Sequence, residues 1–205
     1  MNVSEALQTR RSIGNFDASA TITGAEISAL VDLAQQAPSS FNIQFTRFVV
    51  VTDSAVKAEL QAAAWNQPKI GDAAAVFVLT GAIKAHEAFA VRTKAAADAG
   101  YIPADVAERM VGMANQFYSN AVMAREESVR SVGLSSMALM LAAEERGWVS
   151  CPMIGYDPEA VSKILDLDAD HPPLMVVVVG KPAAENMPRK PRLPASEVLR
   201  VVGAE

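Results

Sequence analysis

Three short apolar runs place the strongest constraint on how this chain can fold. They cover residues 47–51, 74–81 and 173–179, with the sequences RFVVV, AAVFVLTG and PLMVVVV. A membrane-spanning helix needs roughly 20 apolar residues, so these runs are too short to cross a bilayer and have the length of buried strands. Because the segments between them read as helices, the sequence predicts an α/β or α+β domain whose helices cover a central sheet.

Helix boundaries follow from capping residues and from periodicity. Thr23 and Glu26 form a capping box at the start of a helix that ends before Pro38. Asp53 is expected to cap a second helix that runs to about Ala64. Further helices are expected over residues 4–9, 84–99, 103–124 and 126–146.

The chain is predicted to form a single domain over residues 1–205. With 205 residues, of which 51% are hydrophobic, it can bury one sizeable core. Its last segment, 181–205, contains four prolines between Pro182 and Pro194, so regular structure is not expected there. Such a tail often runs across a surface, either its own or that of a partner.

Charge and composition exclude several classes of protein. The net charge is −5 and no basic face is obvious, which disfavours binding to nucleic acid. The single cysteine, Cys151, cannot form an intrachain disulfide, and the first ten residues lack the apolar core of a signal peptide. We therefore expect a cytoplasmic protein that does not bind membranes.

The sequence also lacks the usual motifs for metals and for nucleotide phosphates. His86 and His171 are the only histidines, and they form no Cys/His cluster of the kind that binds zinc. No two glycines are spaced as Gly-x-Gly, so neither a Rossmann fingerprint nor a phosphate-binding glycine loop is present. If the protein binds a nucleotide-like cofactor, side chains must hold its phosphate.

Four polar stretches could supply those side chains. They are RRS at 10–12, APSSFNIQF at 37–45, NQPK at 66–69 and PRKPRLP at 188–194. Arginine suits phosphate because its planar guanidinium donates two hydrogen bonds at once, and lysine adds a point charge. Taken singly, each stretch could equally be a solvated helix end, an ordinary loop or a solvated tail.

Taken together, the stretches resemble the FMN-dependent nitroreductase family, in particular small bacterial NAD(P)H nitroreductases. The resemblance runs from RRSIGNFD through APSSFNIQFTRFVVV and CPMIGYDPEAV to VVVVGKPA and PRKPRLP, almost the whole chain. It implies an α+β fold in which helices wrap a central mixed sheet. It also implies an intertwined homodimer with two FMN sites at the subunit interface and a C-terminal tail that crosses the dimer.

The resemblance assigns roles to particular residues. The FMN phosphate and ribityl chain would be held by Arg10, Arg11, Ser12, Lys190 and Arg192. The second subunit would contribute Pro38, Ser39, Ser40 and Asn42. The polar edge of the isoalloxazine ring would meet Asn66 and Lys69. The loop along the ring, with backbone N–H groups near N5, would be Pro152, Met153, Ile154 and Gly155.

Several apolar residues have two possible roles. Phe117 and Tyr118 could line a substrate pocket or belong to the core, whereas Trp148 is expected in the core. Cys151 is expected to be a small buried residue rather than a redox group. The apolar residues near Leu134 could form a subunit interface or the buried side of one core helix.

The implied activity is a two-electron transfer. NAD(P)H would reduce the FMN and leave, and nitroaromatics, quinones or similar flat acceptors would then be reduced in a ping-pong cycle, with no essential protein acid or base. The alternatives are a same-fold enzyme of other flavin chemistry, such as dehalogenation or flavin fragmentation, and a non-catalytic flavin-binding dimer. This chain departs from the family at two positions. Many members carry a basic residue at the position of Gly14, and some carry a glutamate at the position of Ile154. The resemblance therefore does not establish the reduction potential of the flavin or the choice of substrate.

Overall fold

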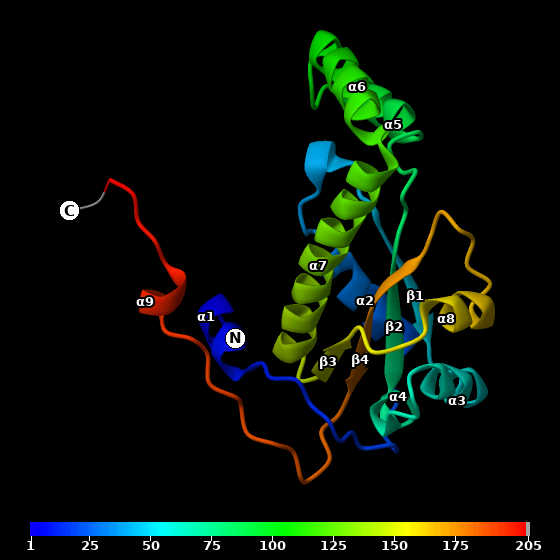
Figure 1. Cartoon of the computed structure of the whole chain (residues 1–205), viewed down its shortest axis with the longest axis vertical. Helices are drawn as coiled ribbons and strands as arrows, with labels where there is room; N and C mark the ends of the chain where they lie inside the picture. The colour runs from blue at the N-terminus through cyan, green and yellow to red at the C-terminus, as the bar shows by residue number, and fades with distance from the viewer. Residues whose placement is uncertain (204–205) are drawn as a thin grey trace.

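The fold is built on an antiparallel sheet of four strands, which a computed structural model describes for residues 1–203 (Figure 1). The strand order is β1 (Thr46–Val51), β2 (Ala75–Gly81), β4 (Pro173–Gly180) and β3 (Val149–Met153). The three predicted strands are confirmed. The expected mixed sheet is wrong for these four strands, since every pairing among them is antiparallel and the parallel bridge from Ser12 to Ser150 is isolated.

Helices and strands together give the α+β class. The helices are α1 (Val3–Thr9), α2 (Gly24–Ala34), α3 (Ser54–Ala63), α4 (Pro68–Asp72), α5 (Phe89–Asp98), α6 (Ala104–Tyr118), α7 (Ala121–Glu145), α8 (Pro158–Ile164) and α9 (Ala195–Val198), with a 3₁₀ turn at Ser40–Asn42. Both predicted caps are confirmed: Thr23 and Glu26 form a capping box, and the Asp53 carboxylate accepts the N–H groups of Ala55 and Val56.

Two predicted helix boundaries are wrong. Residues 84–88 form turns, so α5 begins only at Phe89. The break between the two long helices lies at Ser119 and Asn120 rather than near residue 125. Asn120 starts α7 because its side-chain oxygen accepts the N–H groups of Val122 and Met123, an N-cap that competes with helix continuation.

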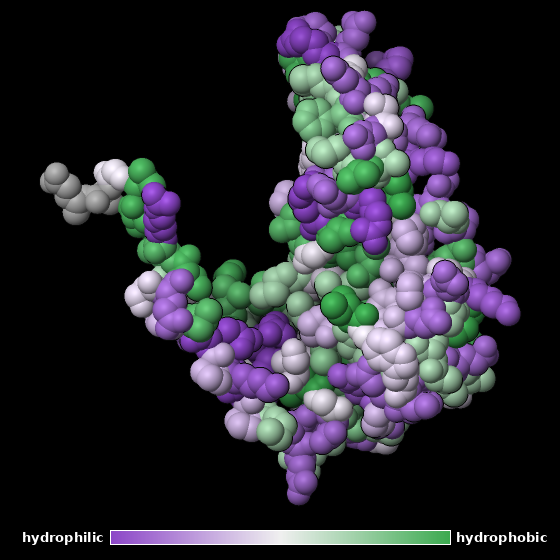
Figure 2. Space-filling view, viewed as in Figure 1, coloured by the Kyte–Doolittle hydropathy of each residue, from purple (hydrophilic) through white to green (hydrophobic). Residues whose placement is uncertain are grey.

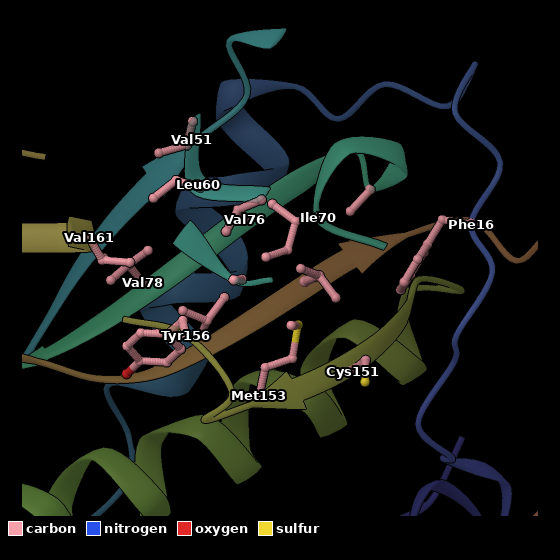
Figure 3. Close-up of a cluster of buried hydrophobic side chains, with 14 of the residues drawn as sticks. Phe16, Val51, Leu60, Ile70, Val76, Val78, Cys151, Met153, Tyr156 and Val161 are labelled. Atoms are coloured by element: carbon pink, nitrogen blue, oxygen red, sulfur yellow. The ribbon is translucent and has the colours of Figure 1, made fainter. Parts of the chain in front are cut away.

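Successive side chains of the central strand β2 point to opposite faces of the sheet, so the core has one cluster on each face. Phe77 and Leu79 point to the face covered by α2 and α7, and Val76 and Val78 point to the face covered by α3, α4 and α8. Figure 3 shows this second cluster, which includes Tyr156. All seven residues of β2 are buried, which explains why the strand is continuously apolar.

Burial of Tyr156 makes the stability of the protein sensitive to alkaline pH. Its side chain lies in the core cluster, and desolvation raises the pKa of its phenol to about 12. Since the unfolded chain forms tyrosinate near pH 10, folding loses stability as the pH rises from 10 toward 12. We expect this residue to cost about 1 kcal/mol of unfolding free energy at pH 11 relative to pH 9.

The measurement is urea unfolding of the native protein and of Tyr156→Phe at both pH values. The native protein should lose about 1 kcal/mol more than the variant between pH 9 and pH 11. Equal losses in the two proteins would show that Tyr156 ionises as easily in the folded state as in the unfolded chain.

The C-terminal segment from Lys181 runs away from the sheet past α1 (Figure 1). It is extended as predicted, apart from the single turn of α9. It is tied to the N-terminal segment near its base, where Phe16 and Pro182 form an isolated bridge. Among the described residues, no helix is both long and apolar enough to span a bilayer.

The other apolar residues considered above lie partly in the core and partly on the surface. Trp148 is buried on the α7 side of the sheet, as predicted, and the Lys181 ammonium lies 4.1 Å from its ring centroid. Met137 packs against the same cluster, whereas Leu134 on the same helix is exposed. The two roles expected for the apolar residues near Leu134 therefore apply to different residues of α7: Met137 faces the core, and Leu134 is exposed and available for an interface.

Candidate functional site

A strongly basic cavity of about 380 Å³ lies between the N-terminal segment, the sheet and the tail. Its wall carries five cationic side chains, Arg11, Lys69, Arg189, Lys190 and Arg192. No acidic side chain among residues 1–203 lines it. The wall also includes Ser12, Ile13, Gly14, Asn15, Cys151, Asn186, Met187 and Pro188. In a protein of net charge −5, this concentration of positive charge indicates an anionic ligand.

Backbone contacts fix the N-terminal wall of this cavity. Ile13 donates its N–H to the carbonyl of Ser150, at the edge of β3. On the other side, the Asn186 side-chain oxygen accepts the N–H groups of Gly14 and Asn15, each at 3.0 Å. The segment 11–15 is therefore held between the sheet and the tail by hydrogen bonds of the protein itself.

Arg189 anchors the tail onto α1. Its Nη1 donates to the carbonyls of Leu7 and Arg10, at 2.9 and 3.1 Å, and also to that of Gln8. These carbonyls belong to the C-terminal turn of α1, where a cation complements both the free acceptors and the helix dipole. The sequence analysis did not include Arg189, although it stands in the same PRKPR run as the predicted Lys190 and Arg192.

The predicted phosphate residues divide into two groups. Arg11, Ser12, Lys190 and Arg192 line the cavity, and Arg11 also donates to the Met187 carbonyl at 2.9 Å. Within residues 1–203, the Arg192 guanidinium donates hydrogen bonds only to the carbonyls of Lys190 and Pro191, both through Nη1, which leaves Nε and Nη2 for a ligand. Arg10 does not line the cavity.

Arg10 is half-buried beside Met140, with its Nη1 3.9 Å from the sulfur. Burial, reinforced by the positive charge of Arg189, lowers the pKa of its guanidinium. Arg10 therefore does not line the cavity, but its charge interacts with those of Arg189 and Arg192, which do.

Lys69 brings a positive charge to the cavity from α4. It lies in α4, a short helix that begins with Pro68 at its first position, and its Nζ is 3.9 Å from the Cys151 sulfur. Cys151 is buried in β3, as predicted. Asn66, which was expected to act with Lys69, is exposed, has a positive φ of 57° and does not line this cavity.

Only the second half of the segment 152–155, which was expected to be a loop, lies outside the sheet. Pro152 and Met153 end strand β3, and Met153 is buried in the core, because its backbone pairs with β4. Only Ile154 and Gly155 form the predicted loop, in which Ile154 is 77% exposed. The strand was not predicted because it contains a proline, Pro152, which is unusual within a strand.

Trp65 is a residue that the sequence analysis missed. It adopts a positive φ of 55° and is 68% exposed, and its ring lies so close to Gly155 that a Cβ there would be 2.9 Å from it. Gln67 donates its side-chain amide to the Gly155 carbonyl at 3.0 Å. The loop after β3 and the turn before α4 therefore form one continuous surface.

The segment around PSSFN lies apart from the basic cavity. Pro38 and Ser39 line a different and much smaller cavity, and none of the predicted residues Pro38, Ser39, Ser40 and Asn42 lines the basic one. The segment has an unusual conformation, with positive φ at Phe41, Asn42 and Gln44. It is held by a hydrogen bond from the Gln44 N–H to the Ser39 hydroxyl at 2.8 Å.

Phe117 and Tyr118 have different surroundings. Tyr118 is buried, its ring centroid is 5.3 Å from that of Phe45 in an edge-to-face arrangement, and burial raises the pKa of its phenol. Of the two roles expected for Tyr118, the structure therefore favours core packing. Phe117 is 54% exposed and lines an open cavity of about 510 Å³ with Phe41 and Met113.

The sequence and the fold both match known proteins. Residues 7–181 match the family described as Nitroreductase family. The chain is 36% identical over 193 residues to a Bacillus subtilis protein named "Putative NAD(P)H nitroreductase MhqN", which covers 93% of this chain and 94% of the relative.

Solved structures share the fold. The B. subtilis nitroreductase ydfN superposes with a TM-score of 0.92 at 34% identity, over 97% of this chain and 98% of the other. A nitroreductase from Exiguobacterium sibiricum, solved in complex with FMN, gives a TM-score of 0.90 at 29% identity over 98% of each chain. The architecture described above is therefore the nitroreductase fold.

Proposed function

This chain belongs to the nitroreductase family, and from that premise we propose that it is an NAD(P)H-dependent oxidoreductase that uses FMN. The observation that carries the proposal is the basic cavity of about 380 Å³, whose described wall has five cations and no carboxylate. A phosphate-bearing cofactor suits such a wall, because a dianion needs several charge-assisted donors to replace its water. The residues present therefore fit FMN.

Arg11, Lys190 and Arg192 would hold the phosphate. Arginine supplies paired donors for phosphate oxygens, and the tail brings two of these three cations to the cavity from a distant part of the sequence. Ser12 adds a hydroxyl on the same wall. Arg189 would act indirectly, since its bonds to the end of α1 fix the tail that carries Lys190 and Arg192.

FMN, when bound, supplies the two-electron chemistry that amino-acid side chains lack. The protein would bind it, orient it and tune its potential. Lys69 is the residue that we assign to this tuning, because it lines the same cavity from α4, beside Cys151 and in a different part of the chain from the phosphate-binding cations. A positive charge there stabilises the more negative, reduced form.

Replacing Lys69 with methionine, which keeps the length of the side chain but removes the charge, is expected to lower the two-electron reduction potential of bound FMN. The loss of about 1–3 kcal/mol of charge interaction corresponds to tens of millivolts for a two-electron couple. Anaerobic titration with a reference dye measures the potential. Lys163→Met, an exposed lysine on α8, is the matched control, and equal potentials in the two variants would contradict this role for Lys69.

We also propose that two copies of the chain form a homodimer with FMN at the interface. Two features support this. The tail exposes apolar side chains that a monomer would leave in water (Figure 2), namely Met187, Leu193, Val198, Leu199, Val201 and Val202. The segment containing Pro38, Ser39, Ser40 and Asn42 does not line its own chain's basic cavity, so a partner is the means by which it would reach FMN. Sedimentation equilibrium tests the assembly.

The reaction that we propose has two halves. NAD(P)H gives two electrons and leaves, and a flat acceptor such as a nitroaromatic or a quinone then takes its place and is reduced. Initial rates at several concentrations of both substrates should give parallel double-reciprocal lines, and intersecting lines would overturn this sequence of events. A cytoplasmic location, where NAD(P)H is regenerated, belongs to the same proposal.

The direct test of the proposed function is an anaerobic absorption spectrum of the purified protein before and after NADH or NADPH is added. Flavin bands that bleach would support the reductase and identify its donor. Flavin bands that persist with both donors would point instead to a non-catalytic flavin-binding protein. A colourless protein that also fails to bind added FMN would overturn the assignment of the basic cavity.

A further inference from the structure

A second cavity, of about 350 Å³, holds two arginines that the proposed reaction does not use. It lies where α2, the loop at 38–45, β1 and α5 meet, and none of its residues lines the basic cavity. Its wall consists of Val31, Gln35, Gln44, Thr46, Arg47, Phe48 and Arg92. The polar residues are all hydrogen-bond donors, and the described wall includes no carboxylate.

Both guanidinium groups are only partly satisfied. Arg47 donates through Nη1 to the carbonyls of Gln44 and Thr46, at 2.7 and 2.9 Å. Arg92 donates through Nη2 to the carbonyls of Ile43 and Ala85, at 2.8 and 3.2 Å, while its Nε is buried without a hydrogen-bond partner. Within residues 1–203, neither arginine has a carboxylate oxygen within 4.0 Å.

The arrangement is costly for the protein alone. Two like charges that share one cavity repel each other, and partial burial removes the water that would screen them. Consistent with this, burial and the positive charge of Arg92 together lower the pKa of Arg47. An anion between the two groups would remove the repulsion and supply the missing acceptors.

We propose that Arg47 and Arg92 form a binding site for an oxyanion, either a carboxylate or a phosphate group, distinct from the flavin cavity. Both groups present oxygen atoms that suit guanidinium forks. Gln35, Gln44 and Thr46 supply further donors at the rim, and Val31 and Phe48 provide an apolar side. The site therefore favours an anionic head attached to a small organic group over a simple halide ion.

The anion would also act on the loop that follows α2. The carbonyls that the two arginines hold, those of Ile43 and Gln44, end the segment in which Phe41, Asn42 and Gln44 have positive φ. An anion that removes the repulsion between the two guanidinium groups would stabilise the arrangement in which they hold these carbonyls, and with it the conformation of the segment. A resulting change in FMN affinity rests on the proposed function, whereas the existence of the anion site does not.

Two sources could supply the oxyanion. One is a free metabolite or inorganic phosphate in solution. The other is a carboxylate of a second copy of this chain, of which Glu197 in the exposed tail is the candidate among the described residues. The experiment therefore needs one arm for each source.

The test is thermal unfolding of FMN-saturated protein over a range of inorganic phosphate concentrations, with sodium chloride holding the ionic strength constant. Saturation with FMN prevents phosphate from acting at the basic cavity. The unfolding temperature of the native protein should rise saturably, by about 3–6 °C at ten times the half-saturating concentration. Arg47→Gln should abolish the rise, and Arg125→Gln, an exposed arginine on α7 outside this cavity, should keep it.

Arg47 is the first choice for substitution because it is the more exposed of the two arginines, so the variant should fold. Arg92→Lys provides a second, charge-conserving variant in which the rise should weaken. A response that appears only in Glu197→Gln, and is lost again when Arg47→Gln is added, would identify the tail carboxylate as the natural occupant. No saturable response in the native protein or in Glu197→Gln, or a response that survives Arg47→Gln, would overturn the proposal.

Discussion

Replacing Arg192 with alanine is expected to raise the dissociation constant for FMN by about 10- to 100-fold. The guanidinium lines the basic cavity and donates only to carbonyls one and two residues away, so its removal leaves the packing of the chain intact. A hydrogen bond to a charged group contributes about 1.5–3 kcal/mol, which corresponds to a change of this size in affinity. Fluorescence titration of the apoprotein with FMN measures the constant.

Arg200→Ala is the matched control for this experiment. Arg200 is an exposed arginine in the same tail, outside the basic cavity, so its loss removes the same charge from the protein without removing a ligand to the phosphate. Its dissociation constant should stay within about threefold of that of the native protein. If both variants bind FMN as the native protein does, the tail does not complete the phosphate site.

Replacing Phe77 with alanine is expected to reduce the free energy of unfolding by about 3–5 kcal/mol, or to lower the unfolding temperature by about 6–20 °C. Phe77 is fully buried at the centre of β2, where it is paired with Val50 on one side and Val177 on the other. Its ring packs under α2 and α7, and alanine would leave a cavity that neighbouring side chains in two layers cannot fill. Guanidinium unfolding provides the measurement.

Tyr101→Ala is the comparison, because this aromatic side chain is 83% exposed and should change stability by no more than about 0.5 kcal/mol. Similar losses in the two variants would mean that the register of β2, which turns Phe77 toward α7, is incorrect. The comparison is therefore a test of the sheet as well as of one side chain.

The parts of the fold that were predicted correctly depend on local signals. The strands at 47–51, 74–81 and 173–179 are long apolar runs, and the caps at Thr23 and Asp53 act on N–H groups two or three residues away. Strand β3 was missed because its sequence, VSCPM, contains a serine and a proline. It is a strand because β4 pairs with it, which is a contact between residues far apart in the chain.

The candidate site shows the same division. Arg11, Ser12, Lys69, Lys190 and Arg192 were identified through a family resemblance, and they do line one cavity. The sequence left Phe117 and Tyr118 between a pocket and the core, and the structure separates them because neighbouring residues on a helix point in different directions: Phe117 is exposed and Tyr118 is in the core. Trp65 had no local signal, since its importance comes from its contact with Gly155. Arg189 stands in the basic run that the sequence analysis singled out, but its bonds to the end of α1 could not be read from the sequence.

By itself, the sequence determined three of the four buried strands, where several helices begin, and that side chains rather than a glycine loop would have to hold any bound phosphate. These properties depend on periodicity, on hydrogen bonds that span a few residues, and on which residue types are present. Only the tertiary structure decided that the tail returns to α1, that β3 completes the sheet, and that Arg47 and Arg92 share a cavity to which residues 1–203 contribute no carboxylate. Such features join residues distant in sequence, and the physical reason that they form is the packing of the whole chain around β2 and β4.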